Sequence, residues 1–526
     1  MKRTATLLLL TGILATLLLT GHLACGRRSS RTYTVADAEG DWGYPNPYGM
    51  YPRGPGYVRM SFIYETLVWK DRSGDTVPAL ATDWRYVEDQ TAWEFTIRDD
   101  VRWHDGQPVT AADVTFTFRY IKQHPWPWVD GNLVANVSTD GDSVRVKLNE
   151  PYAPFMTNVA GTLPILPRHV WKDVEEPGQF RGQGAAVGCG PYRLEEYDAA
   201  RGTYLMTAFE GYYRGTPAVE RLQFVRYSRE MAPAALRRGD INASQVPAET
   251  VEALRDTDLE LISQPPTWAA KLMINHRQEP LSNRKMRHAL GYAIDAGRIA
   301  DIVRRGHAIA GSPGLLPPSN EPWHNPDVTR YGHDPEHARQ ILRELGYERR
   351  PDGVFEKGGE PVTFTLLCSP QRMEFGRLAE LLEQQLEEAG IGIEVRSAEA
   401  SVLDSRLKDW HFELALSGHG GLGGDPEILN RMILGGSFNS ARYRKNERLV
   451  ELLERQVCTT DPGQRRTRVH RAQELYAKEL PAITLYHPEW HWAHDGRLDL
   501  YHTPGGMALG IPLPLNKLSF VRTNRP

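Results

Sequence analysis

Residues 64–114 of the chain read YETLVWKDRSGDTVPALATDWRYVEDQTAWEFTIRDDVRWHDGQPVTAADV. Residues 93–97 alternate apolar and polar side chains, as a half-buried strand does. Asp105-Gly106 predicts a turn, and Thr110 followed by Asp113 predicts the capped start of a helix that runs through Ile121. The stretch also contains three tryptophans that we expect in the core: Trp84, Trp93 and Trp103. A strand, a turn and a helix in one stretch indicate a mixed fold.

Strands and helices continue to alternate through the rest of the chain. Residues 143–148 follow a Gly-Asp turn and alternate as a strand does. One helix is expected to begin at Asp334-Pro335 and end at Gly346. Leucines at helical spacing predict a second helix within 378–389, and Asp461-Pro462 opens a third that reaches Leu480. Together these segments predict an α/β protein with several sheets.

Length and composition limit the class of protein. The chain has 526 residues, of which 40% are hydrophobic and 24% are charged. This is a globular composition, because a disordered chain has fewer apolar residues. At ~100–200 residues per domain, the length predicts about three lobes. The 62 Lys and Arg against 66 Asp and Glu give a net charge of -4, so no nucleic-acid partner is expected.

The first thirty residues carry an export signal. Lys2 and Arg3 precede an apolar run and then small residues before Cys25, which is the layout of a secretory signal. We expect residues 1–24 to be a signal peptide and residues 25–31 a linker. Ala24-Cys25 resembles the cleavage site of bacterial lipoproteins, which implies a lipid on Cys25; the alternative is ordinary cleavage and a free periplasmic protein. The remaining cysteines allow at most one disulfide: Cys189, Cys368 and Cys458.

The stretch quoted first resembles the signature of a known family, the large extracytoplasmic solute-binding proteins of ABC importers that bind peptides or nickel. Residues 188–192 read GCGPY, which is similar to that family's Gly-Thr-Gly-Pro-Tyr. Further similar blocks follow in the family's order: residues 287–290, 293–295, 334–347 and 366–390. Such signatures mostly preserve the scaffold. We accordingly expect Arg287 and Asp295, on one predicted helix, to be solvated or to cap it.

The resemblance implies a fold of three lobes, a periplasmic-binding-protein-like two-jaw cleft with an additional inserted lobe. Lobe I would comprise three segments: residues 32–60, 190–285 and 490–526. Lobe II would be residues 61–189, and lobe III residues 286–489. The family encloses its ligand between lobes I and III when a hinge closes.

A glycine-rich loop is the first candidate for ligand contact. Residues 417–426 read SGHGGLGGDP, and so many glycines exclude a helix and let backbone approach a ligand. In peptide-binding relatives this loop lines the cleft, and its aspartate pairs with the ammonium group of the peptide. Here that place holds Leu422, so the ammonium partner is missing. We expect ligand contacts from four residues: His419, Gly420, Gly421 and Leu422.

His419 leaves two interpretations open. An imidazole can hydrogen-bond, titrate near neutral pH or ligate a metal, and nickel-binding relatives use a histidine in the corresponding loop region for a metal chelate. The alternative is a loop histidine bonded to a neighbouring carbonyl. Apart from His419 under the nickel interpretation, we expect no metal ligand and no cofactor.

Three more residues are candidates through the resemblance. Dipeptide-binding relatives carry an arginine at the place of Arg372, where its guanidinium clamps the ligand carboxylate; a surface arginine is the alternative. Tyr44 and Tyr48 lie in a segment that would face the cleft and stack on the ligand, although simple loop packing explains them equally well.

Residues 487–494 read HPEWHWAH and suggest a metal site at first sight. Pro488 argues against the helix that a His-Glu-x-x-His zinc site needs. On a strand, His487, Glu489 and His491 would share one face. We expect a strand that crosses between lobes III and I here, with an aromatic interface rather than a metal.

The predicted function is that of an extracytoplasmic solute-binding protein, periplasmic or at the cell surface. It would capture short peptides as a monomer and deliver them to an ABC permease and its ATPase. A nickel or metallophore chelate is the second possible ligand. An exported hydrolase is disfavoured, because the chain has no Gly-x-Ser-x-Gly, no His-Glu-x-x-His and no spaced cysteine ligands. A chaperone or receptor on the same scaffold stays open.

Overall fold

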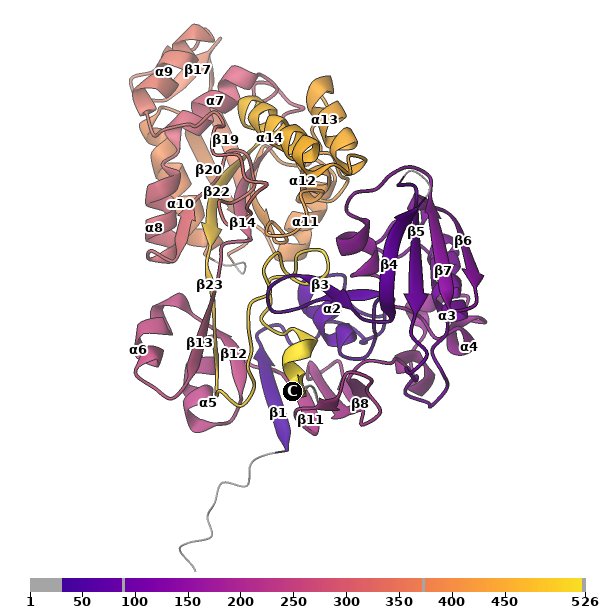
Figure 1. Cartoon of the computed structure of the whole chain (residues 1–526). Helices are drawn as coiled ribbons and strands as arrows, with labels where there is room; N and C mark the ends of the chain where they lie inside the picture. Colours follow the sequence, from indigo (N-terminus) through magenta and orange to yellow (C-terminus); the bar gives the residue numbers. More distant parts are fainter. Residues whose placement is uncertain (1–30, 88–89, 371–373, 523–526) are drawn as a thin grey trace, which may run out of the picture.

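Three sheets organise the computed structural model, which describes residues 31–87, 90–370 and 374–522 (Figure 1). The predicted Cys25 and Arg372 sites lie outside these ranges. Strands and helices are mixed throughout, so the α/β prediction is confirmed. Within the described ranges, no helix combines the length and the hydropathy that crossing a bilayer requires.

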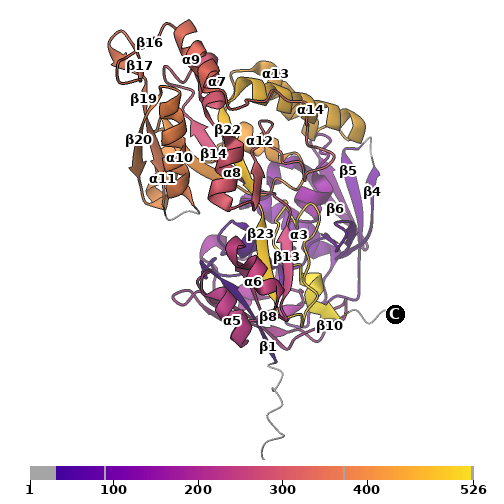
Figure 2. The same ribbon diagram turned by 90° about the vertical axis from the view of Figure 1, so that its left-hand side faces the viewer.

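The seven-stranded sheet draws its strands from both ends and the middle of the chain. Its order is β13 (Glu260–Gln264), β23 (Trp490–His494), β12 (Ala243–Val246), β1 (Thr32–Asp37), β11 (Arg221–Arg226), β9 (Thr203–Ala208) and β8 (Tyr192–Asp198). Two short helices, α5 (Ala232–Arg238) and α6 (Val251–Arg255), lie beside β12, β13 and β23 (Figure 2). Ala36 on β1 and Ala493 on β23 share an apolar cluster with Leu236 of α5, so this helix is held by burial.

The four-stranded antiparallel sheet contains two strands of the stretch quoted first, whereas residues 68–70 and 76–78 of that stretch pair in a separate two-stranded sheet. The order of the four-stranded sheet is β4 (Ala81–Val87), β5 (Ala92–Ile97), β7 (Ser143–Leu148) and β6 (Val134–Asp140), with α3 (Ala111–Gln123) packed against it. The predicted strand, turn and helix are confirmed, and the Asp113 carboxylate accepts the Thr110 backbone N–H at 2.8 Å. Trp93 and Trp103 are buried, whereas Trp84 is only half-buried against the same core.

The six-stranded sheet has the order β15 (Ala308–Ala310), β22 (Ala482–Pro488), β14 (Ala269–Ile274), β21 (Leu414–His419), β19 (Thr363–Cys368) and β20 (Gly392–Ser397). One face packs on α7 (Arg284–Ala293), α8 (Ala296–Arg304), α9 (Pro335–Glu344) and α10 (Phe375–Glu388). The other packs on α11 (Ala400–Lys408), α12 (Ile428–Ile433), α13 (Glu447–Val457) and α14 (Pro462–Glu479). The predicted helices near 334–346, 378–389 and 461–480 are α9, α10 and α14.

Short elements complete the described chain. They are α2 (Gly54–Ser61), β2 (Val68–Lys70), β3 (Thr76–Pro78), η1 (Gly131–Leu133), η2 (Phe155–Ala160), α4 (Arg168–Trp171), η3 (Pro177–Gln179), η4 (Gln183–Ala186), β10 (Thr216–Pro217), η5 (Ala248–Thr250), β16 (Glu348–Arg349), β17 (Phe355–Lys357), β18 (Glu360–Pro361), η6 (Lys517–Phe520) and β24 (Val521–Arg522). Among the described residues, Cys189, Cys368 and Cys458 form no disulfide with one another.

The chain passes between the seven- and six-stranded sheets at two places. Residues 265–268 join β13 to β14, and Glu489 alone separates β22 from β23. The strand crossing expected over residues 487–494 is therefore confirmed. β14, which the sequence boundaries assign to lobe I, is hydrogen-bonded between β22 and β21 of the six-stranded sheet. The apolar side chains of β14 are buried in the middle of the six-stranded sheet. No local feature of the sequence indicates that β14 belongs to this sheet.

Of the two roles expected for Arg287, the solvated one is wrong and the capping one is confirmed at the C-terminal end of α14. Arg287 is not solvated: its side chain is 1% exposed, and its guanidinium donates to the backbone carbonyls of Glu479, Leu480, Leu281 and Ser282. Asp295 lies beyond the end of α7 and caps the next helix, where it accepts the Arg298 backbone N–H at 2.9 Å. The carbonyls that accept from the Arg287 guanidinium come from two segments far apart in the sequence, which only the folded structure brings together.

Candidate functional site

The glycine-rich loop begins at the end of β21 and packs tightly on its surroundings. A Cβ on Gly418 would overlap the Trp268 indole ring, and a Cβ on Gly420 would lie 3.2 Å from its Cδ1. Gly421 has φ +82°, a conformation that L side chains rarely adopt. The glycines are therefore required here by close approach and by backbone conformation.

The same loop touches segments from the rest of the molecule. A Cβ on Gly424 would lie 3.0 Å from the Gly510 Cα, and Lys70 at the end of β2 donates to the Gly506 carbonyl at 3.1 Å. Burial lowers the pKa of Lys70, opposed by the charge of Asp425. The loop thus lies where the six-stranded sheet, the C-terminal segment and the β2–β3 hairpin meet.

Behind the loop, one face of the six-stranded sheet carries polar side chains. Lys271 on β14 pairs with Ser417 on β21 and with Thr484 on β22, while Ala269 pairs with His419. Because side chains alternate along a strand, these four polar side chains project from the same face. All four are buried: Lys271 is fully inaccessible, and His419 is 6% exposed. Polar side chains on a sheet face otherwise covered by apolar helices are unusual.

Several polar atoms of this cluster make no hydrogen bond within the described part of the chain. They are both ring nitrogens of His419, the Ser417 Oγ and the Thr484 Oγ1. The Lys271 Nζ donates to the Asn439 carbonyl at 2.7 Å. Buried polar groups are nearly always paired, so unpaired ones mark a place for a partner. The alternative that His419 is bonded to a neighbouring carbonyl is wrong.

Burial sets the charge of the cluster. Desolvation lowers the pKa of Lys271 to about 7. Desolvation also holds the pKa of His419 well below its usual range, and the nearby charge of Lys271 acts in the same direction. At neutral pH the imidazole is therefore uncharged, with a lone pair that can accept a hydrogen bond or bind a metal. A carboxylate beside Lys271 would restore the full charge of the ammonium group.

The other residues predicted to contact the ligand lie outside the polar cluster. Leu422 is fully buried in an apolar cluster, and its N–H donates to the Thr267 carbonyl at 3.0 Å. The Tyr44 hydroxyl donates to the Gly182 carbonyl and the Tyr48 hydroxyl to the His124 carbonyl. These hydrogen bonds of Tyr44 and Tyr48 favour loop packing, the alternative interpretation, over stacking on a ligand. Gly420 and Gly421 stay beside His419 in the loop.

Three residues of the polar cluster were not predicted as site residues from the sequence: Lys271, Ser417 and Thr484. The available signal is a lysine inside the strand AAKLMI, because a charge amid apolar neighbours in a central strand needs a reason. Residues 414–419, which read LALSGH, and residues 482–488, which read AITLYHP, likewise place polar residues within apolar runs, Ser417 and Thr484 among them. Nothing in the three separate runs reveals that the strands are neighbours.

Comparison with known proteins gives consistent matches. A family model described as "Bacterial extracellular solute-binding proteins, family 5 Middle" matches residues 75–441. The oligopeptide-binding protein AppA of Bacillus subtilis is 25% identical over 461 residues, covering 84% of this chain and 83% of its own. The nickel-binding periplasmic protein of Escherichia coli is 26% identical over 378 residues, covering 67% and 69%. The crystal structure of NikZ from Campylobacter jejuni in complex with Ni(L-His) superposes with a TM-score of 0.79 at 20% identity, covering 91% and 98%.

Proposed function

Because the chain belongs to the bacterial extracellular solute-binding proteins of family 5, we propose that it captures short peptides between lobes I and III and delivers them to the permease and ATPase of an ABC importer. It is an extracytoplasmic solute-binding protein. The relative AppA, named as oligopeptide-binding, supports the choice of peptides. The protein performs no chemistry on its ligand, in contrast to an exported hydrolase.

The lobes divide where the chain passes between sheets. Pairing of β14 with β21 and β22 supports ending the middle segment of lobe I near residue 265 instead of 285. Residues 265–268 and Glu489 then form the hinge between lobes I and III. Two short connections are what a hinge closure needs, because few backbone dihedrals have to change.

The polar face behind the glycine loop carries the peptide proposal. The buried Lys271 side chain donates to the Asn439 carbonyl, and a peptide carboxylate beside it would hold the ammonium group fully charged and pair with it. The loop offers no ammonium partner at Leu422, so recognition rests on the carboxylate end. His419, Gly420 and Gly421 supply polar and backbone contacts beside it, and Arg372 is proposed as a second cation.

Replacing Lys271 by methionine should weaken peptide binding by about 10–100-fold, because a charge-assisted hydrogen bond contributes about 1.5–3 kcal/mol. Peptides released from the purified protein by acid are identified by mass spectrometry and synthesised as free acids and as C-terminal amides. In calorimetry, the wild type should prefer the acid by a similar factor, and Lys271→Met should not distinguish the two.

The exposed Lys285→Met serves as the matched control and should bind like the wild type; its ammonium pairs with Glu344 on the surface at 3.0 Å. Equal wild-type affinity for acid and amide would contradict the role of Lys271.

A metal chelate is the second candidate ligand, favoured by the unpaired ring nitrogens of His419. The nickel-binding relative from Escherichia coli and the Ni(L-His) complex of NikZ support it. A calorimetric titration with Ni²⁺, with and without free histidine, separates the two ligands. Heats that are lost in His419→Ala would favour the chelate; heats that free histidine leaves unchanged would count against it.

We also propose that the protein is held at the membrane by a lipid on Cys25. The support is the sequence around Ala24-Cys25, with a basic start and an apolar run before it. Replacing Cys25 by serine should move most of the protein from the membrane fraction to the soluble fraction, measured by immunoblotting of fractionated cells. The buried Cys189→Ser is the control and should leave the distribution unchanged. Wild-type protein in the soluble fraction would indicate ordinary cleavage instead.

A further inference from the structure

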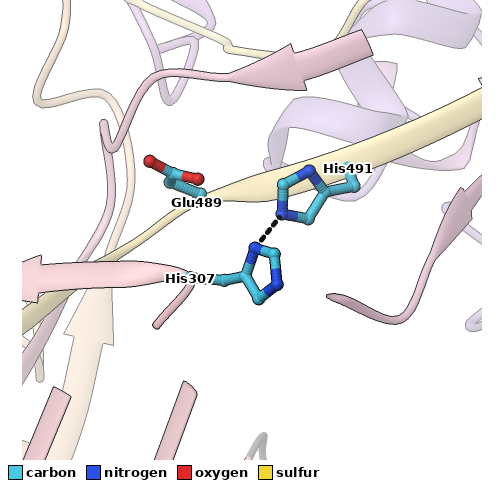
Figure 3. Close-up of side chains that lie close together, drawn as sticks. All are labelled: His307, Glu489 and His491. Carbon is cyan, nitrogen blue, oxygen red and sulfur yellow. Dashed lines mark hydrogen bonds between the residues drawn. The ribbon is translucent and has the colours of Figure 1, made fainter. Parts of the chain in front are cut away.

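Three metal-binding side chains meet at the connection between the seven- and six-stranded sheets. His307 lies just before β15, Glu489 lies between β22 and β23, and His491 lies on β23. Each offers one ligand atom, and these atoms all lie within 4.8 Å of one another. Figure 3 shows the two imidazoles joined by a hydrogen bond, with the Glu489 carboxylate nearby; the ring planes are nearly perpendicular, at 82°. His487, which the sequence placed with Glu489 and His491, instead accepts the Ser312 N–H and bonds the Trp268 carbonyl.

The geometry of the two histidines suits a metal ion. The His491 Nε2 and the His307 Nδ1 are 3.1 Å apart and share one hydrogen bond. Two nitrogens bound to tetrahedral Zn²⁺ at about 2.0–2.1 Å are separated by about 3.3 Å. A metal ion can therefore take the place of the shared proton while the two nitrogens stay close to their present separation, each ring turning to aim its lone pair at the ion. Two imidazoles and a carboxylate leave a fourth position for water.

The surroundings orient the ligands as in established metal sites. The other ring nitrogen of His491, Nδ1, lies 3.0 Å from the Ser263 Oγ. A metal-ligating histidine almost always has its second nitrogen bonded in this way, because the bond fixes the ring and its tautomer. The Glu489 N–H donates to the His307 carbonyl at 2.9 Å and holds the two segments together.

Charged groups near these three side chains include some that oppose and some that favour the binding of a cation. The Arg304 guanidinium donates to the Glu489 carbonyl at 3.1 Å and would repel a dication. Arg304 is itself paired with the Glu374 carboxylate at 2.8 Å, which offsets its charge. The positive charge of Arg255, the last residue of α6, also acts at His491 and would oppose a dication. The Glu489 carboxylate supplies the negative charge that the site needs.

We propose that His307, Glu489 and His491 bind a divalent transition-metal ion such as Zn²⁺ at the hinge. His307 belongs to the segment that enters the six-stranded sheet, and His491 belongs to the seven-stranded sheet. A metal bound to both therefore ties the two sheets together across Glu489 and restrains the angle between them. Metal occupancy would then tune how readily the molecule opens and closes, whatever solute it carries.

The test uses Co²⁺ as a spectroscopic probe and Zn²⁺ for affinity, with the purified protein after treatment with a chelator. We expect one equivalent of Co²⁺ to give the visible absorption bands of a tetrahedral site, and Zn²⁺ to abolish them by competition. His307→Ala and His491→Ala should each weaken Zn²⁺ binding by about 100-fold or more. In hydrogen exchange, Zn²⁺ should slow the backbone amides of the non-proline residues at the hinge: Thr267, Trp268, His487, Glu489, Trp490 and His491.

Two control variants keep the test specific. His411→Ala removes an exposed histidine outside the cluster and should bind Zn²⁺ like the wild type. His419→Ala removes the candidate chelate ligand behind the glycine loop and should also leave Zn²⁺ binding unchanged. The inference is overturned if Zn²⁺ binding survives in His307→Ala and His491→Ala, or if it disappears in His419→Ala.

Discussion

Replacing Lys517 by methionine should lower the free energy of unfolding by about 3–5 kcal/mol. The Lys517 ammonium on η6 pairs with the Glu65 carboxylate at 2.9 Å, and the two side chains are 1% and 0% exposed. The Tyr212 hydroxyl donates to the other carboxylate oxygen of Glu65 at 2.8 Å. Methionine fills a similar volume but leaves the buried Glu65 charge without the cation that pairs with it. The measurement is chemical unfolding followed by tryptophan fluorescence.

The size of this effect depends on burial. Lys285→Met breaks a comparable ammonium–carboxylate contact at 3.0 Å, but its side chains are 59% and 46% exposed, so its cost should be about 0–1 kcal/mol. Adding Glu65→Gln to Lys517→Met should recover part of the lost stability, because the uncompensated charge is then removed. A loss as small as that of Lys285→Met would show that the buried pair does not hold the C-terminal segment in place.

Replacing Gly188 by alanine should cost about 3 kcal/mol or more, at the upper end of overpacking penalties. A Cβ on Gly188 would overlap the Ile63 carbonyl, and a Cβ on Gly190 would lie 2.5 Å from the Phe62 carbonyl. The backbone here is fixed on both sides. The Gly190 N–H donates to the Ile63 carbonyl at 2.8 Å, and the His104 N–H donates to the Gly188 carbonyl at 2.7 Å.

A methyl group at residue 188 therefore meets backbone that cannot move aside. Gly178→Ala is the matched control, because its Cβ would meet nothing within 4 Å, and its effect should stay within about 0.5 kcal/mol. Thermal unfolding of both variants checks the difference. Equal midpoints for the two variants would refute the steric explanation of the glycines in GCGPY.

Local patterns were sufficient for much of the secondary structure. The Thr110 and Asp113 pair correctly marked the start of α3, and Asp334, with its carboxylate on the His337 N–H at 2.9 Å, marked the start of α9. These signals lie within one turn of the helix that they define. The glycine loop was also recognisable, because its composition excludes a helix by itself. The family followed from many separated blocks in the right order.

The side chains that give the candidate sites their chemistry depend on the tertiary structure. Lys271 and Ser417 become neighbours only because β14 pairs with β21, and His307 reaches His491 only because the chain returns to the hinge much later. Strand pairing and burial are long-range properties, since a strand's own side chains do not specify its partner. Helix ends and the family signature are thus encoded in short stretches of the chain. Which polar groups are buried together, and with what charge, is decided when distant strands join one sheet and exclude water.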